Sequence, residues 1–422
     1  MTIISLIQAA TGFDPEAATR AYLATLSGAA RVRSDHYFEG GYWTGLWGTL
    51  VAAASYWLML RLGWSAKWSG WASRVTRRRW LQPALYSLPF GIFGALLTLP
   101  WTIYSGFFRE RQYGLMNQTF PAWLGEQGIA LAVSLVTTAI FFTVVVALIR
   151  RAPRSWWAWA GGATPLMLAL MVMVAPVFIA PLFNKYTLMA AGPMRDNILG
   201  MAHRQGIPAD NVYVFDASKQ TKRISANVSG LGPTIRISLN DNLLGRSSPE
   251  GVMAVMGHEM GHYVLNHIPK SLAYFTLLSF ALMFLLWWVG PRLLARYGAR
   301  WGVRDASDPA VAPLFAIVIL LVFLALTPLL NTMTRVHESA ADAFGLEAAR
   351  QPDGFAMTAM QLSEYRKLEP TALEEKLFYD HPSGRTRVRM AMQWKARHLA
   401  ELPPEQRGMI VMTSPTPPIV AK

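Results

Sequence analysis

The chain has 422 residues, of which 53% are hydrophobic and only 15% are charged, whereas soluble globular proteins carry about 25% charged residues. This composition argues against a soluble protein and favours a membrane protein. The absence of cysteine excludes disulfides and thiolate metal sites. The net charge of +14 does not predict nucleic-acid binding, because many of the arginines flank apolar segments, as charges that set membrane orientation do.

Six apolar stretches are each long enough to cross a bilayer as a helix, which takes about 20 residues. They lie at 43–62, 84–106, 128–149, 156–182, 271–290 and 311–330. Tryptophan and tyrosine occur at several of their ends, as is typical of a membrane interface. We therefore expect an N-terminal segment, four membrane helices, a catalytic region with edge strands, two more membrane helices, a second catalytic region and a tail. Their expected bounds are 1–42, 43–182, 183–270, 271–330, 331–400 and 401–422.

The two ends of the chain differ in character. Residues 1–10 are apolar but too short to span a membrane, and three interpretations stay open: a shortened signal segment, the end of a seventh membrane helix, or an ordinary helix. The last residues are rich in proline, serine and threonine around 414–418, which predicts a disordered tail.

The region before the fifth membrane helix predicts a small sheet followed by a helix. Short strands are expected at 211–216, 222–228 and 234–239, and a glycine-rich turn joins the last two in a hairpin. The helix is expected at 248–267, because Ser248 followed by Pro249 is typical of a helix N-terminus.

This helix carries the motif His258-Glu259-Met260-Gly261-His262. Histidines four residues apart lie on one helix face, so both can bind one zinc ion. Glu259 lies beside the metal and can take a proton from metal-bound water. The alternative is two surface histidines on an amphipathic helix, but the apolar residues around the motif favour burial. We therefore predict His258 and His262 as zinc ligands and Glu259 as the catalytic base.

A catalytic zinc ion usually has three protein ligands and one open position for water. Glu338 is the predicted third ligand, because it follows the sixth apolar stretch on a helix whose small residues permit close approach to another helix. Asp342, one turn later, is predicted to accept a hydrogen bond from a ligand histidine. His337 is an alternative ligand that points away from Glu338, and Arg335 is expected to pair with a carboxylate.

A histidine directly before a proline, His381, is a candidate to donate a hydrogen bond to the transition-state oxyanion, although such a histidine is more often a capping or surface residue. His267 and His203 have no partner pattern and are interpreted as structural or exposed. Three arginines begin the next helix, and one of them is a candidate to hold a substrate or a carboxylate: Arg385, Arg387 and Arg389.

Together these features resemble the type I CAAX prenyl endopeptidase family, which consists of integral-membrane zinc proteases of the gluzincin kind. The resemblance runs from about Tyr42 to Met390 and covers most of the chain. Five segments carry it: 113–119, 176–185, 257–262, 331–342 and the pair His381-Pro382 with Arg387.

The resemblance implies a mainly α-helical, multi-pass membrane protein in which a barrel of helices encloses a chamber. A small β-hairpin or sheet and a zincin-type pair of catalytic helices complete this expected fold. The resemblance implies one zinc ion with the ligands and base predicted above, support of the transition state by His381, and Arg387 as a further site residue. The family usually has seven membrane helices, one more than the six predicted here.

The resemblance also implies that a substrate strand adds to the edge of the sheet near 223–229. Relatives usually have Asn-Ala-Tyr there, and this chain has Ser225-Ala226-Asn227. Ala226 and Asn227 are therefore candidate substrate contacts, and because the neighbours of the alanine differ, the preference of the relatives is not carried over to this chain.

The predicted activity is that of a zinc metalloendopeptidase that hydrolyses peptide bonds near substrate C-termini. The expected partners are the lipid bilayer and a peptide or protein substrate, with or without a lipid. Two alternatives stay open: a quality-control protease for unprenylated membrane proteins, and a catalytically silent membrane scaffold. The sequence does not predict the oligomeric state.

Two interpretations of the membrane orientation stay open. Positive charges follow the first, third and fifth apolar stretches, and the positive-inside rule makes those loops cytoplasmic. The catalytic side would then face the periplasm from the inner membrane of a bacterium, whereas analogy with eukaryotic members of the family places it in the cytosol.

Overall fold

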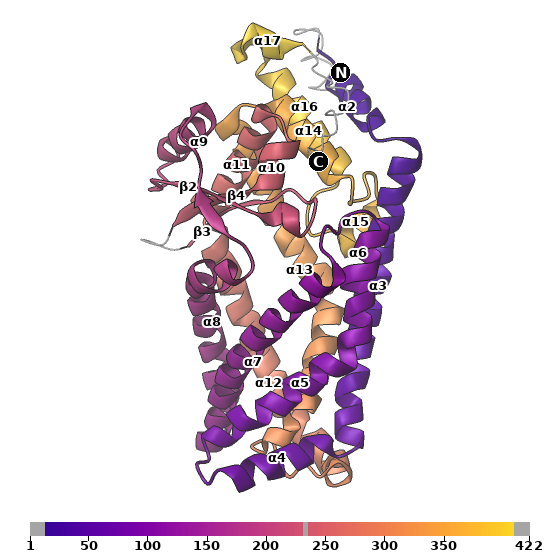
Figure 1. Cartoon of the computed structure of the whole chain (residues 1–422), viewed down its shortest axis with the longest axis vertical. Coiled ribbons are helices and arrows are strands. Elements are labelled where there is room, and N and C mark those ends of the chain that lie inside the picture. Colours follow the sequence, from indigo (N-terminus) through magenta and orange to yellow (C-terminus); the bar gives the residue numbers. More distant parts are fainter. Residues whose placement is uncertain (1–12, 231–234, 409–422) are drawn as a thin grey trace.

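The structure is a computed structural model that describes residues 13–230 and 235–408. Long helices make up one half of the molecule, and the strands with the shorter helices make up the other half (Figure 1). The expectations for residues 1–10 and for the tail from residue 409 onward lie outside the described residues.

Six long helices correspond to the six predicted membrane stretches. They are α3 (Gly28–Arg61), α5 (Leu81–Ile103), α7 (Phe120–Arg151), α8 (Trp156–Val174), α12 (His267–Trp301) and α13 (Ala312–Ala349). A π-helical turn, η1 (Tyr104–Phe108), and α6 (Arg109–Gln112) extend α5, and two further turns, η2 (Ala175–Ile179) and η3 (Ala180–Leu182), extend α8.

Among the described residues, five of these helices are long and apolar enough to cross a membrane, α3 being the exception. The predicted stretch 43–62 forms the second half of α3, but tryptophan, tyrosine, glycine and threonine there replace much of the leucine and valine found in the other five. Length and composition therefore support five membrane helices in the described chain, and the sequence-based number of six is corrected to that extent.

The membrane helices form a wall and not a solid bundle. In the most apolar part of each of the five helices, only 0% to 33% of the residues are buried within the protein. Helices in the middle of a bundle are buried all round, so these helices expose both their outer and their inner faces. This arrangement agrees with the predicted helical barrel around a chamber.

Several shorter helices were not predicted, and two of them lie in the first part of the chain. Helix α4 (Trp64–Val75) lies between α3 and α5 at the end of the molecule far from the sheet, and α2 (Pro15–Ala24) packs against the C-terminal helices (Figure 1). Both are too short and too polar to appear as apolar stretches of membrane length.

The C-terminal region is helical. It contains α14 (Pro352–Leu362), α15 (Ala372–Phe378), α16 (Gly384–Arg397), η7 (Leu399–Glu401) and α17 (Pro404–Arg407). The prediction of a disordered tail from residue 401 is wrong for residues 401–407. Leu402 is buried in the same cluster as Trp394 and Val388, so this segment packs on α16.

The sheet has four strands in the order β1-β2-β4-β3: β1 (Tyr186–Leu188), β2 (Val212–Phe215), β3 (Ala226–Ser229) and β4 (Arg236–Asn240). The three predicted strands form, and β3 and β4 pair as the predicted antiparallel hairpin. Strand β1 was missed because it is only three residues long, and the parallel pairing of β2 with β4 was not predicted. Helices α9 (Pro193–Arg204) and α10 (Asp241–Arg246) flank the sheet. Strand β3 lies at its edge and packs on α11 (Pro249–Val264).

Helix α11 begins as the sequence predicts. The Ser248 hydroxyl accepts a hydrogen bond from the backbone N–H of Gly251, and Pro249 occupies the first turn. Small residues let α11 and α13 approach each other closely. A Cβ atom on Gly345 would lie 2.8 Å from the backbone nitrogen of His258, and one on Gly257 would lie 3.0 Å from the carbonyl oxygen of Gly345. These glycines therefore set the separation of the two helices that carry the predicted ligands.

Candidate metal centre

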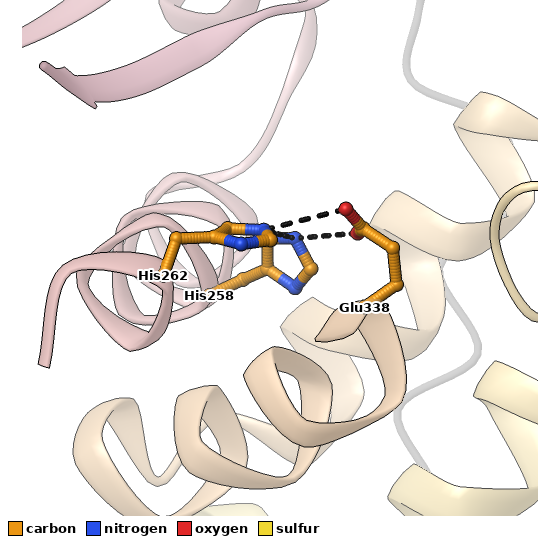
Figure 2. Close-up of side chains that lie close together, drawn as sticks. All are labelled: His258, His262 and Glu338. Atoms are coloured by element: carbon orange, nitrogen blue, oxygen red, sulfur yellow. Dashed lines mark hydrogen bonds and ion pairs between the residues drawn. The ribbon is translucent and has the colours of Figure 1, made fainter. Parts of the chain in front are cut away.

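The structure brings the three predicted ligand residues together. His258 and His262 project from α11, and Glu338 projects from α13 toward their imidazoles (Figure 2). Nε2 of His258 lies 3.1 Å from Nε2 of His262 and 3.2 Å from Oε2 of Glu338, and Nε2 of His262 lies 3.5 Å from Oε1 of Glu338. Among the described residues, these three side chains form the group of histidines and carboxylates that could hold a metal ion.

These separations fit a tetrahedral metal ion. Ligand bonds of about 2.0–2.2 Å at tetrahedral angles place neighbouring ligand atoms about 3.3–3.6 Å apart, close to the three distances observed. Oε2 of Glu338 is buried and has no hydrogen-bond partner among the residues that the structure describes, although two imidazole nitrogens lie near it. A buried carboxylate oxygen without a partner is costly, and a cation among these atoms would satisfy it. The donor set of two imidazoles and one carboxylate is one that zinc accepts.

The other ring nitrogen of His258 faces Asp342, as predicted. Nδ1 lies 2.8 Å from Oδ1 of Asp342, at the separation of an ion pair but without full hydrogen-bond geometry. Burial lowers the pKa of the His258 imidazole, but the contacts with Asp342 and Glu338 outweigh this effect and raise the pKa to about 10. The carboxylate of Asp342 therefore increases the basicity of this imidazole, which would make it a stronger metal ligand.

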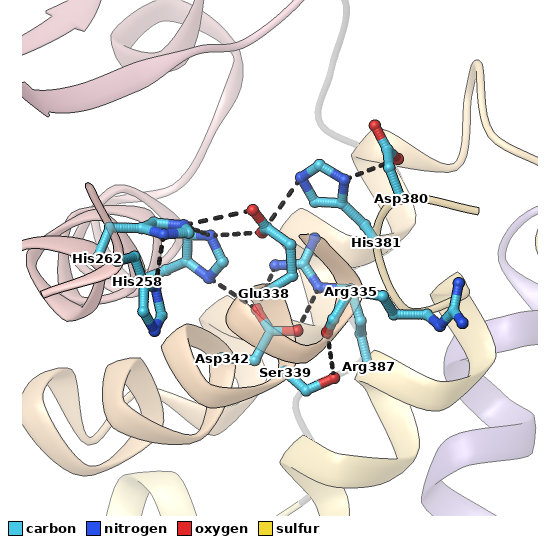
Figure 3. A network of polar contacts seen from close by, with 10 residues as sticks. His258, His262, Arg335, Glu338, Ser339, Asp342, Asp380, His381 and Arg387 are labelled. Atoms are coloured by element: carbon cyan, nitrogen blue, oxygen red, sulfur yellow. Dashed lines mark hydrogen bonds and ion pairs between the residues drawn. The ribbon is translucent and has the colours of Figure 1, made fainter. Parts of the chain in front are cut away.

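Arg387 holds Asp342 in place from the opposite side. Its Nε donates to Oδ2 at 2.9 Å and one terminal nitrogen donates to Oδ1 at 2.6 Å (Figure 3). Both side chains are buried. Burial lowers the pKa of Arg387, but the neighbouring carboxylate of Asp342 outweighs this effect, so the pKa is raised. This bidentate pair fixes the orientation of the carboxylate. Arg387 therefore contacts Asp342 and none of the three predicted metal ligands.

His262 has a different partner, His267 at the start of α12. Their Nδ1 atoms are 2.9 Å apart. If Nε2 of His262 binds a metal, its Nδ1 carries the proton and donates it to His267. His267 is buried, so its sequence-based interpretation as structural or exposed missed this contact. His337, the alternative ligand, stacks on His267 with ring centroids 4.4 Å apart and is not in the ligand group.

No spacing rule reveals His267, because it follows His262 by five residues and a continuous helix would place it on another face. Asn266 adopts a left-handed conformation with φ of 56°, and this residue separates α11 from α12. The change of direction brings His267 back to His262. The only sequence signal is the helix-breaking asparagine itself.

Glu259 lies next to the first ligand and is partly buried. In the described part of the chain, no hydrogen bond or ion pair engages its carboxylate. Burial raises the pKa of Glu259, whereas the neighbouring His258 and His262 lower it, with a net rise. A carboxylate with a raised pKa is a stronger base, which suits proton transfer from water.

His381 lies on the other side of Glu338. Its Nε2 is 3.1 Å from Oε2 of Glu338, and its Nδ1 is 2.8 Å from Oδ1 of Asp380, which orients the ring (Figure 3). Arg335 holds this loop to α13, because its guanidinium donates to the carbonyl oxygens of Glu375 and Tyr379. The expectation that Arg335 pairs with a carboxylate is therefore wrong: its partners are backbone carbonyls and a threonine hydroxyl.

The predicted substrate contacts lie on the edge strand. Ala226 pairs with Leu239 and Asn227 pairs with Ser238, both on β4. The opposite edge of β3 has no partner in the sheet, and β3 packs on the helix of the ligand histidines. An extended peptide added to this edge would therefore run close to α11.

Two family models match the chain. The model described as peptidase family M48 matches residues 190–395, which contain His258, Glu259, His262, Glu338 and His381. The model described as CAAX prenyl protease N-terminal, five membrane helices, matches residues 24–185. Together they account for nearly all of the described chain.

Individual proteins agree with these matches. The chain is 28% identical over 338 residues to the uncharacterized metalloprotease YhfN of Bacillus subtilis (strain 168), across 80% of this chain and 79% of that protein. It is 27% identical over 304 residues to CAAX prenyl protease 1 of Saccharomyces cerevisiae, across 68% of this chain and 67% of that protein.

The crystal structure of S. mikatae Ste24p has the same fold. It matches with a TM-score of 0.72 and 21% identity, across 93% of this chain and 99% of that chain. The fold, the membrane helices and both family models point to one conclusion: the chain belongs to peptidase family M48 and is a multi-pass membrane metalloendopeptidase.

Proposed function

We propose that this protein is a zinc-dependent endopeptidase that cleaves peptide bonds near the C-termini of membrane-associated substrates. One observation carries the proposal: two imidazole nitrogens and a carboxylate oxygen meet at separations close to the edges of a zinc tetrahedron. The metal would be held by His258, His262 and Glu338. When bound, zinc supplies an activated water molecule and polarises the scissile carbonyl.

The proton transfers fall to residues of the chain. Glu259 takes a proton from the attacking water and later delivers it to the leaving amine. His381, oriented by Asp380, donates a hydrogen bond to the oxyanion that forms at the scissile carbonyl. Asp342, fixed by Arg387, keeps the imidazole of His258 in the orientation that binding requires.

The substrate is proposed to bind as an added strand on β3. Backbone hydrogen bonds to the free edge would hold an extended peptide, and Ala226 and Asn227 would contact its side chains. The names of several relatives identify them as CAAX prenyl proteases. We therefore propose a C-terminal, prenylated peptide as the first substrate class.

The second candidate is a protease that degrades unprenylated membrane proteins. The sequence Ser225-Ala226-Asn227 favours this candidate, because the two residues beside Ala226 differ from those usual in the prenyl endopeptidase family. Membership of a peptidase family argues against the third alternative, a catalytically silent scaffold.

A cleavage assay separates these candidates. The purified protein in detergent is incubated with a farnesylated peptide that ends in a CAAX sequence and with the same peptide without the farnesyl group. We expect release of a C-terminal fragment from the farnesylated peptide and at least a tenfold lower rate without the lipid. Equal cleavage of both peptides would favour the quality-control activity, and cleavage of neither would contradict both.

For the orientation, we propose that the catalytic half faces away from the cytoplasm, since the arginine-rich loops lie at the opposite end of the membrane helices. Reporter fusions after residue 422 test this. Alkaline phosphatase activity is expected, and a signal from a cytoplasmic reporter alone would contradict the proposal.

A further inference from the structure

A cavity is lined by residues from the end of the membrane helices that lies far from the sheet and the metal centre. Figure 1 shows this end of the helices beside α4. The cavity has a volume of about 580 Å³. It forms where the end of α7 and the start of α8 meet α12, Arg79 shortly before α5 and the loop before η6 (Pro309–Val311). Nothing in the proposed proteolysis uses this cavity.

Three arginines line the cavity, and two of them form no ion pair with any carboxylate that the structure describes. Arg304 pairs with Asp308 at 2.9 Å. Arg150 donates to two backbone carbonyl oxygens, those of Ser307 at 3.3 Å and Arg79 at 2.5 Å. The side chain of Arg79 has no hydrogen bond or ion pair within the described ranges. Two guanidinium groups therefore share one cavity without an ion pair, although the more distant charges of Asp308 and Asp305 attract that of Arg150.

The acidic residue in the lining, Asp305, forms no ion pair with Arg79 or Arg150 in the described part of the chain. Oδ1 of Asp305 accepts hydrogen bonds from the backbone N–H and the hydroxyl of Ser307, at 2.7 and 2.6 Å. Near a hydrocarbon boundary the effective dielectric constant is low, so two neighbouring positive charges repel each other more strongly than in water. An anion bound between Arg79 and Arg150 would relieve this repulsion, and phosphate oxygens match the geometry of guanidinium groups.

The rest of the lining is apolar and suits a hydrocarbon chain. It includes the larger side chains Ile149, Trp156, Trp287, Pro291 and Leu294, with Ser307 as a polar exception. These side chains lie at the ends of apolar helices, where a bilayer changes from acyl chains to headgroups, and tryptophan is enriched at this depth. A free phosphate ion would make no use of such a wall, whereas a phospholipid would contact both parts of the cavity.

We propose that this cavity binds an anionic phospholipid, with its phosphate between Arg79 and Arg150 and an acyl chain along Trp287 and Leu294. Basic pockets between membrane helices bind anionic headgroups in this way. The site is separate from the metal centre, so it provides a means by which the composition of the membrane stabilises the helical half of the enzyme.

The test measures the thermal unfolding midpoint of the full-length, delipidated protein in detergent. Phosphatidylglycerol, phosphatidylcholine and inorganic phosphate are titrated separately. We expect a saturable increase with phosphatidylglycerol and no comparable increase with the other two. Arg79→Gln removes a hydrogen bond to a charged group. The phosphatidylglycerol concentration that gives half of the maximal increase in the unfolding midpoint should therefore rise about tenfold.

Arg78→Gln is the matched control, because it makes the same charge change one residue earlier, outside the cavity lining, and it should bind as the wild type does. Arg79 is exposed and makes no contact that folding requires, so its variant should fold. Equal effects of both phospholipids, or equal behaviour of the two variants, would overturn the proposal. A full effect of inorganic phosphate alone would show that the site binds a free anion and not a lipid. Counting bound lipids by native mass spectrometry gives a second measurement of the same difference.

Discussion

Nδ1 of His258 lies 2.8 Å from Oδ1 of Asp342, and the same carboxylate receives two hydrogen bonds from Arg387. The first of the two proposed ligand histidines therefore contacts a buried carboxylate whose orientation two hydrogen bonds hold. This contrasts with His262, whose partner is the imidazole of another histidine. The two ligands of α11 are thus held by different means.

The carboxylate of Asp342 is expected to strengthen metal binding. Asp342→Asn keeps the shape of the side chain but removes its charge, so zinc affinity should fall about 10–100-fold. Competition with a chelator of known affinity measures this change. An unchanged affinity in a variant that retains its fold would show that Asp342 serves packing alone.

His267 is expected to orient His262. His267→Ala removes the acceptor of the Nδ1 proton, so zinc affinity should fall about tenfold, at the lower end of the range for such partners. His337→Phe is the control, since a phenyl ring can still stack on His267 while the contact with His262 stays. If both variants lose affinity equally, the stack and not the hydrogen bond is responsible.

Glu259 is expected to act on protons and not on the metal. Glu259→Gln should lower the rate of peptide cleavage by about 10²–10⁴-fold, the usual contribution of a general base, and should leave the zinc content unchanged. Glu250→Gln, an exposed change on the first turn of the same helix, should retain activity. Full proteolysis by the Glu259 variant with metal present would refute this role.

His381 is expected to support the transition state. His381→Asn should reduce kcat by about 10²–10³-fold, as the loss of an oxyanion donor does, with little change in zinc content. Asp380→Asn should have a smaller effect, because Asp380 only orients the ring. A loss of metal from the His381 variant would instead make this histidine part of the metal environment through its contact with Glu338.

Much of the fold follows from hydrophobic pattern. Five apolar stretches give membrane helices, and Ser248 and Pro249 mark the start of α11. The remaining features depend on contacts distant in sequence. Strand β1 is too short to show a period. The segment after α16 is ordered because Leu402 is buried against that helix.

The residues of the candidate site also fall into those that local pattern predicts and those that depend on distant contacts. Spacing within one helix predicts that His258 and His262 can share an ion, and the small residues of α13 predict its close approach. Arg335 was wrongly assigned a carboxylate partner, because backbone carbonyls of a distant loop leave no trace in sequence. His267 was missed because the turn at Asn266 is a property of the backbone.

The metal content of the purified protein tests the central claim most directly. Elemental analysis should find one zinc ion per wild-type chain and none in Glu338→Ala, which removes one of three ligands. Glu347→Ala, an exposed change farther along α13, should keep its zinc. Zinc retained in full by the Glu338 variant would contradict the account, because the two imidazoles would then bind the ion without this carboxylate.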